Sequence, residues 1–152
     1  MASIEVAHFG LCVSDLQTAL RFYCDGLGFE VAEGYDVGDE VAATLEVEQG
    51  VSLRSQMIRK GATKIELLAW TSPSVTGTPS ATRKQLGFTH LSFQVTDMPA
   101  VEARLVEHGA TVIESTRTHF DLGAATIDLL FLADPDGTRI ELMETIVPTP
   151  DT

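Results

Sequence analysis

The chain carries an internal repeat, and this feature constrains its fold more than any other. Residues 8–16 align without a gap to residues 90–98, so that a histidine, a valine, a small hydroxyl residue, an aspartate and a long apolar residue recur in register. Residues 63–68 align in the same way to residues 138–143, where every position is identical or chemically equivalent. Because both matches occur in the same order, we interpret the chain as two copies of one module.

Each copy is expected to fold as β-α-β-β-β, which makes the fold class α+β. An alternating stretch with the period of a half-buried strand opens each copy. Asp15 and Asp97 then follow as N-caps of a helix. The predicted strands are 4–13, 30–35, 52–58 and 64–70, with a short additional stretch at 41–45, in the first copy, and 88–95, 111–114, 125–133 and 138–144 in the second.

The two copies are expected to form a single domain over residues 1–147. Module 5–70 and module 87–145 are joined by a linker at 71–86, whose first part is almost entirely Ser, Thr, Pro and Gly. A flexible tail is expected at 148–152.

Composition and missing motifs exclude several classes of function. The 10 Lys and Arg residues against 22 Asp and Glu residues give a net charge of −12, which disfavours nucleic acid and membrane surfaces as partners. Two cysteines, no spanning apolar run and no signal-peptide pattern predict a cytoplasmic protein. Without a Gly-rich phosphate loop, a Gly-x-Ser-x-Gly elbow or a Cys-x-x-Cys motif, phosphoryl transfer, dinucleotide redox and serine hydrolase chemistry lack support. The expected partner is a small-molecule substrate.

The repeat places a histidine on the first strand and a glutamate on the last strand of each copy. Each residue alone has an ordinary interpretation, because a strand histidine is usually structural and alternation can turn a glutamate to solvent. Their recurrence in register favours a shared site instead. Two imidazoles and two carboxylates suit a divalent ion such as iron(II), manganese(II), cobalt(II), nickel(II) or zinc(II). The predicted metal ligands are His8, Glu66, His90 and Glu141.

Five further residues are candidates for contact with substrate. Cys12 follows the first histidine by four positions, so it should share that residue's face of the strand and line the cavity. Trp70 and Tyr35 either form walls of an apolar pocket or belong to the core. Arg117 and His119 lie in a predicted loop, where they either contact substrate or are solvated.

Four segments of the chain resemble the vicinal oxygen chelate superfamily. This group includes glyoxalase I, methylmalonyl-CoA epimerase, extradiol dioxygenases, fosfomycin-resistance transferases and bleomycin-binding proteins. The most specific piece is Asp-Pro-Asp-Gly at 134–137, which is followed closely by Ile-Glu-Leu. The resemblance implies paired βαβββ modules in a curved, cup-shaped mixed sheet around a metal. Members build this cup within one chain or between two, and a homodimer is expected. The segments are 8–28, 64–68, 90–109 and 132–144.

The complete set of four ligands resembles that of glyoxalase I. It implies an isomerase, epimerase or lyase that acts on a small α-oxo or acyl substrate through a metal-stabilised enediolate, with Glu141 or Glu66 as the base. In glyoxalase I an arginine that binds glutathione follows the first histidine by four positions, and an asparagine lies four beyond the first glutamate. Cys12 and Trp70 occupy those places here, so glutathione is not expected as a co-substrate.

Two alternatives stay open at this point. A non-haem iron ring-cleaving dioxygenase of the same superfamily would use His8, His90 and Glu141. A non-catalytic protein that sequesters a drug or natural product, as bleomycin resistance proteins do, would use Trp70 and Tyr35 as aromatic walls.

Overall fold

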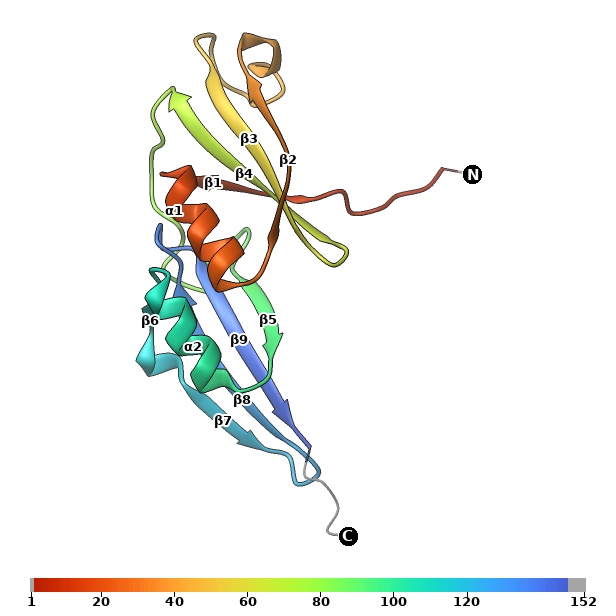
Figure 1. Ribbon diagram of the computed structural model, residues 1–152, viewed down its shortest axis with the longest axis vertical. Helices are drawn as coiled ribbons and strands as arrows, with labels where there is room; N and C mark the ends of the chain where they lie inside the picture. The colour runs from red at the N-terminus through yellow and green to blue at the C-terminus, as the bar shows by residue number, and fades with distance from the viewer. Residues whose placement is uncertain (1, 148–152) are drawn as a thin grey trace. The chain divides into compact units, whose positions relative to one another are not determined.

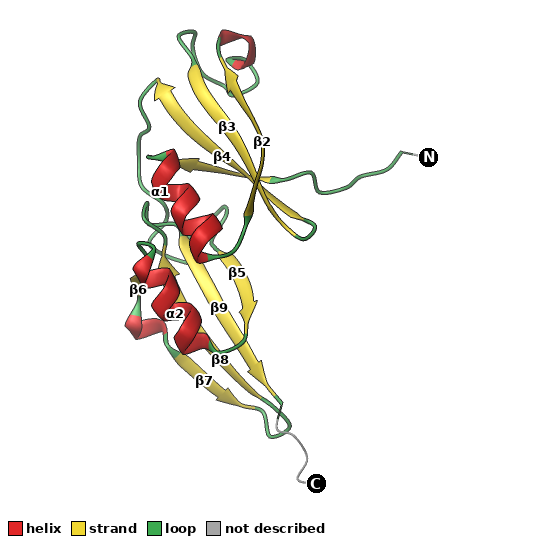
Figure 2. Ribbon diagram, viewed as in Figure 1, coloured by secondary structure: helices red, strands yellow, loops and turns green. Residues whose placement is uncertain are grey.

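The computed structural model describes residues 2–147, which form two units, residues 2–77 and residues 78–147 (Figure 1, Figure 2). Each unit contains one mixed β-sheet and few helical residues, which confirms the predicted α+β class. The tail predicted at 148–152 lies outside the described residues. No described helix is long and apolar enough to cross a membrane.

The first unit runs β-α-β-β-β, as predicted. Its sheet has the strand order β1-β4-β3-β2, in which β1 is parallel to β4 and the other neighbours are antiparallel. The elements are β1 (Phe9–Val13), α1 (Leu16–Leu20) continued by the π-helical segment η1 (Arg21–Gly26), β2 (Glu30–Val37), the 3-10 helix η2 (Asp39–Val41), β3 (Ser52–Lys60) and β4 (Thr63–Ser72).

The short additional stretch predicted between β2 and β3 is not a strand. Its backbone bonds locally instead: the amide of Leu45 donates to the carbonyl of Val41 at 3.0 Å. The Asp39 carboxylate closes the loop by accepting from the amides of Gly50 and Val51 at 2.6 Å and 2.8 Å. Backbone groups engaged in turns are not available to a neighbouring strand, so an apolar composition alone was misleading here.

The second unit repeats this plan with one more strand. The sheet order is β5-β9-β8-β6, with β7 also paired to β8 and β5 parallel to β9. A loop was expected at the position of β7, whose four residues are all exposed, so no burial alternation marks it as a strand. The elements are β5 (Leu91–Val95), α2 (Met98–Glu107), β6 (Thr111–Val112), the 3-10 helix η3 (Glu114–Thr116), β7 (Thr118–Asp121), β8 (Thr126–Ala133) and β9 (Arg139–Ile146).

Both helices begin where the sequence predicted. The Asp15 carboxylate accepts from the amide of Thr18 at 2.7 Å, and the hydrogen bonding to Thr18 lowers the pKa of Asp15. The Asp97 carboxylate accepts from the amide of Ala100 at 3.2 Å. These bonds satisfy amide groups that have no partner inside a first helical turn.

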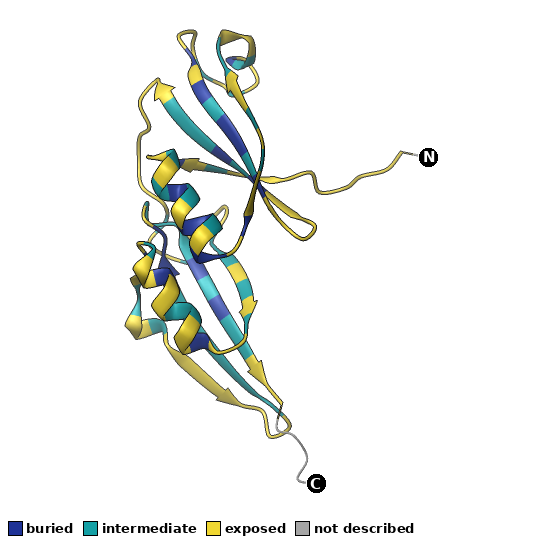
Figure 3. Ribbon diagram, in the orientation of Figure 1, coloured by how far each residue is buried: buried dark blue, intermediate teal, exposed yellow. Residues whose placement is uncertain are grey.

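In each sheet the helix covers one face, and the candidate ligand glutamate lies on the other face. Helix α1 contacts β4 and α2 contacts β9, and burial alternates along these strands (Figure 3). Ile65 and Leu67 on β4 are 1% and 0% exposed, and Ile140 on β9 is 0% exposed. Because successive side chains of a strand point to opposite faces, Glu66 and Glu141 point away from the helices.

Helix α2 has a second cap, which comes from the last strand of its sheet. Glu144 on β9 accepts from the amides of Asp97 and Met98 through its two carboxylate oxygens, at 2.6 Å and 3.0 Å. In the aligned repeat the position of Glu144 corresponds to Ala69. A carboxylate at a helix N-terminus also interacts favourably with the helix dipole.

We expect Glu144→Ala to lower the free energy of unfolding by about 2 kcal/mol, because two charge-assisted hydrogen bonds are lost. Urea denaturation followed by circular dichroism measures this change. The control is Glu30→Ala, which removes an exposed ion pair of 3.1 Å with Arg59 and should cost less than about 1 kcal/mol. Equal losses in the two variants would contradict this role for Glu144.

Candidate functional site

The first His–Glu pair consists of His8 and Glu66 in the first unit. His8 directly precedes β1, and the parallel register of β1 and β4 sets Gly10 opposite Glu66. Nε2 of His8 lies 3.1 Å from Oε2 of Glu66, and the side chains are 37% and 20% exposed. The buried hydroxyl of Ser55 on β3 donates to the other oxygen, Oε1 of Glu66. Both oxygens of this carboxylate are therefore engaged.

The second His–Glu pair consists of His90 and Glu141 in the second unit. His90 precedes β5, whose parallel register with β9 sets Ser92 opposite Glu141. Nε2 of His90 lies 3.4 Å from Oε2 of Glu141, and the side chains are 30% and 17% exposed. The imidazole is positioned by Thr89, whose hydroxyl oxygen lies 2.8 Å from Nδ1, and by the edge-on ring of Phe131 at 5.1 Å.

The geometry of each pair fits two neighbouring ligands of one cation. Ligand atoms bound at roughly 2.0–2.2 Å from a tetrahedral or octahedral ion lie about 3.0–3.5 Å apart, the range in which both pairs fall. If the Thr89 hydroxyl accepts from the N–H at Nδ1 of His90, the lone pair at Nε2 is left for an ion. Within neither unit do three or more described His, Cys, Asp or Glu side chains gather at one point. Each unit therefore offers two ligands.

The two glutamates differ in how firmly they are held. Glu66 is fixed by Ser55 on one oxygen and by His8 on the other. Among the described residues, the Glu141 carboxylate contacts His90, through Oε2. Leu129 occupies the position in the second sheet that Ser55 occupies in the first, since they lie opposite Met143 and Leu68 respectively. Glu141 is thus the carboxylate with an oxygen available to exchange a proton.

Three of the predicted contact residues lie in the first unit. Cys12 is exposed on β1 and pairs in register with Leu68, two positions beyond Glu66 along the same face. Tyr35 lies opposite Ser55 and is 57% exposed. Trp70 packs partly buried against the apolar cluster of Ala42, Val51 and Leu53. All three lie on the face that carries Glu66, and their contact with substrate stays a prediction.

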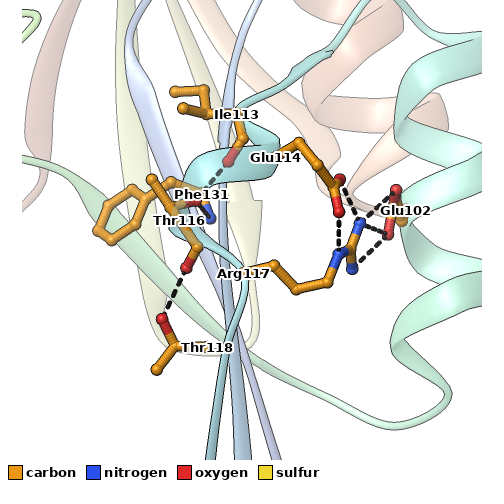
Figure 4. Close-up of polar contacts among 7 residues, drawn as sticks. All are labelled: Glu102, Ile113, Glu114, Thr116, Arg117, Thr118 and Phe131. Carbon is orange, nitrogen blue, oxygen red and sulfur yellow. Dashed lines mark hydrogen bonds and ion pairs between the residues drawn. The ribbon is translucent and has the colours of Figure 1, made fainter.

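Arg117 and His119 lie on the other face of the second sheet. Arg117 donates to Glu102 on α2 at 3.1 Å and to Glu114 at 2.7 Å, and this network raises the pKa of Arg117 (Figure 4). Nδ1 of His119 lies 2.6 Å from Oδ1 of Asp128. Asp128 shares its strand face with the buried Leu130, whereas Glu141 is opposite Phe131 on the other face. The sheet therefore separates Arg117 and His119 from Glu141, and their contact with substrate also stays a prediction.

Ser55 and Thr89 support the two pairs but were not singled out from the sequence. Thr89 is adjacent to His90 in the chain, and a hydroxyl residue next to a candidate ligand is the sequence signal for this contact. Ser55 reaches Glu66 from a neighbouring strand, and only the strand register reveals this contact.

The family model described as the Glyoxalase/Bleomycin resistance protein/Dioxygenase superfamily matches residues 5–142, and the chain belongs to this family. The match confirms the predicted membership of the vicinal oxygen chelate group.

Two curated relatives and one solved structure give this assignment more detail. The chain is 28% identical over 152 residues to a 2-epi-5-epi-valiolone epimerase of an Actinomyces species, covering 93% of this chain and 79% of the relative. It is 29% identical over 149 residues to a catechol-2,3-dioxygenase of Bacillus subtilis, covering 93% of this chain but 43% of the relative, so it spans less than half of that protein. A glyoxalase family protein from Bacillus cereus shares the fold, with a TM-score of 0.78, 21% identity, and coverage of 96% and 99% of the two chains.

We expect Ser55→Ala to weaken Co²⁺ binding about ten- to a hundredfold, because the Glu66 carboxylate loses the hydroxyl that orients it. Isothermal titration calorimetry with Co²⁺ measures the affinity. The control is Ser52→Ala at the exposed start of the same strand, which should bind like the wild type. Unchanged affinity in Ser55→Ala would show that the hydroxyl does not orient a ligand.

Proposed function

We propose that this protein is a divalent-metal-dependent isomerase, epimerase or lyase that acts on a small α-oxo or acyl compound. The observation that carries the proposal is the repeated His–Glu pair, with donor atoms 3.1 Å and 3.4 Å apart. The proposed ligands are His8, Glu66, His90 and Glu141, supplied by one chain or by two copies of a homodimer. Nickel(II), cobalt(II), zinc(II), manganese(II) and iron(II) all accept such a set.

The family match and the relatives support this proposal from another direction. One relative is named an epimerase and the other a dioxygenase, so the family contains enzymes of more than one reaction type. An epimerase inverts a carbon centre, and a proton removed from one face of that carbon can return to the other face.

The bound ion would supply a Lewis acid that stabilises negative charge on a substrate oxygen. Glu141 is the base in this proposal. Its free oxygen, Oε1, accepts the proton from the carbon beside the substrate carbonyl, while the electron pair of the broken C–H bond moves onto the carbonyl oxygen. Return of the proton from Glu141 to the neighbouring carbon completes an isomerisation. An epimerisation instead requires a proton on the opposite face of the same carbon, delivered by solvent water, whose hydroxide then takes up the proton held by Glu141. Glu66, held by Ser55, keeps its role as a ligand.

A ring-cleaving dioxygenase is the second candidate, favoured by the relative named catechol-2,3-dioxygenase. It would use His8, His90 and Glu141 as iron ligands and leave Glu66 as an additional carboxylate. Consumption of oxygen with a catechol by the iron-loaded protein would favour this candidate over the isomerase.

We expect the protein, purified without chelator or His-tag, to contain about one divalent ion per chain and to lose it in His8→Ala and in Glu141→Ala. Elemental analysis by mass spectrometry measures the content. His108→Ala is the control, because the His108 ring bonds to the carbonyl of Arg104 at the end of α2. Protein that lacks metal and takes none up on reconstitution would contradict the proposal and favour the non-catalytic binding protein.

We expect Glu141→Gln to slow turnover at least about a hundredfold, because the amide cannot accept the proton. Deuterium exchange at the α-carbon of α-oxo acids in D₂O, followed by ¹H NMR, reports this step directly. The control is Glu107→Gln at the end of α2. Exchange at the wild-type rate in Glu141→Gln would exclude Glu141 as the base.

A further inference from the structure

A cavity of about 310 Å³ opens on the second sheet, on the face that carries Glu141. Its apolar wall consists of Ile113, Leu129 and Phe131. Two arginines, Arg83 and Arg139, also line it. The cavity thus combines a hydrocarbon wall with two cationic groups.

Arg83 is held in place by neutral acceptors. Its guanidinium donates to the carbonyls of Ser80 and Thr89, and its central carbon lies 5.8 Å from the centroid of the Phe131 ring. Carbonyl partners fix the orientation of the guanidinium but leave its positive charge uncompensated. The guanidinium N–H groups that are not bound to these carbonyls can donate hydrogen bonds to an anion.

Arg139 adds a second charge to the same cavity. Its guanidinium donates to the carbonyl of Gly137 at 2.9 Å. Both side chains line the same cavity. Burial, and then the charge of Arg139, lower the pKa of Arg83. The corresponding residue in the first module, Lys64, has an acidic partner in Glu33 at 3.8 Å.

Neither arginine of the cavity has an acidic partner among the described residues. The chain has 22 acidic residues and 10 basic ones, and several of the cations form ion pairs. Among the ion pairs of residues 2–147, none involves Arg83 or Arg139. Two half-buried like charges without a counter-ion favour the binding of an anion.

We propose that Arg83 and Arg139 bind the anionic oxygen group of a small organic acid, a carboxylate or a phosphate, whose hydrocarbon part lies against Ile113, Leu129 and Phe131. Phe131 connects this cavity to the second His–Glu pair, because its ring contacts His90 and its backbone pairs with Glu141. The assignment of this anion to the substrate rests on the function proposed above. It restricts that substrate to an acid.

The test is calorimetric titration of the full-length protein with benzoate and with phenyl phosphate, and with benzamide as the neutral analogue. We expect an anion to bind and benzamide to bind at least about tenfold more weakly. Arg139→Gln should weaken anion binding about ten- to a hundredfold and leave benzamide binding unchanged. Arg83→Gln should do the same, and Arg139→Gln decides the question if Arg83→Gln fails to fold. The control is Arg59→Gln, whose side chain pairs with Glu30 on the surface of the first unit.

The same titration after treatment with EDTA separates this proposal from the metal site. Anion binding that persists without metal and is lost in the arginine variants supports the cavity, whatever the metal content of the protein. Anion binding that is lost with EDTA and kept in the arginine variants would overturn it, because the anion would then be a ligand of the ion. Equal binding of benzoate and benzamide would overturn it as well. Preference for phenyl phosphate over benzoate would identify the anionic group as a phosphate.

Discussion

The parallel pairing of the first and last strands of each module is the constraint on which the candidate site depends. A parallel neighbour requires a long crossover, here a helix and two or more antiparallel strands, so the residues it aligns are far apart in the chain. In both modules this pairing sets the histidine that precedes the first strand beside a glutamate on the last strand. In each module the helix packs against buried apolar residues on the opposite face of the sheet.

The repeat produces two similar His–Glu pairs, which differ in the hydroxyl group that holds one member of each pair in place. In the first pair a hydroxyl from β3 holds the glutamate, and in the second a hydroxyl beside the histidine positions the imidazole. A fixed carboxylate suits a ligand, whereas a carboxylate with an available oxygen suits a base. The second unit also carries the cavity with Arg83 and Arg139, so the groups proposed to act on a substrate belong mainly to that unit.

The sequence predicted the fold class and both N-caps, because repetition of residue types in register is a strong signal. The convergence of His8, Glu66, His90 and Glu141 on one metal stays a prediction, and the contact of each histidine with the glutamate of its own module is a finding of the structure. The sequence could not predict β7, because an exposed edge strand has no alternating burial pattern. It also predicted a strand at 41–45, where the chain forms turns and the Asp39 carboxylate closes the loop. Ser55 contacts Glu66 from a neighbouring strand, so this contact could be predicted only once the strand register is known. Arg117 was considered for substrate contact from its place in a loop, but its two carboxylate partners were visible only in three dimensions.

The central claim is that both His–Glu pairs bind a divalent ion through their imidazole and carboxylate groups. X-ray absorption spectroscopy at the cobalt edge of the Co²⁺-loaded protein tests it most directly, because scattering from imidazole rings gives the number of histidines per ion. The account predicts two imidazoles per ion, oxygen atoms as the remaining ligands and no sulfur. A spectrum with no imidazole, with one imidazole, or with a sulfur ligand from Cys12 would contradict it.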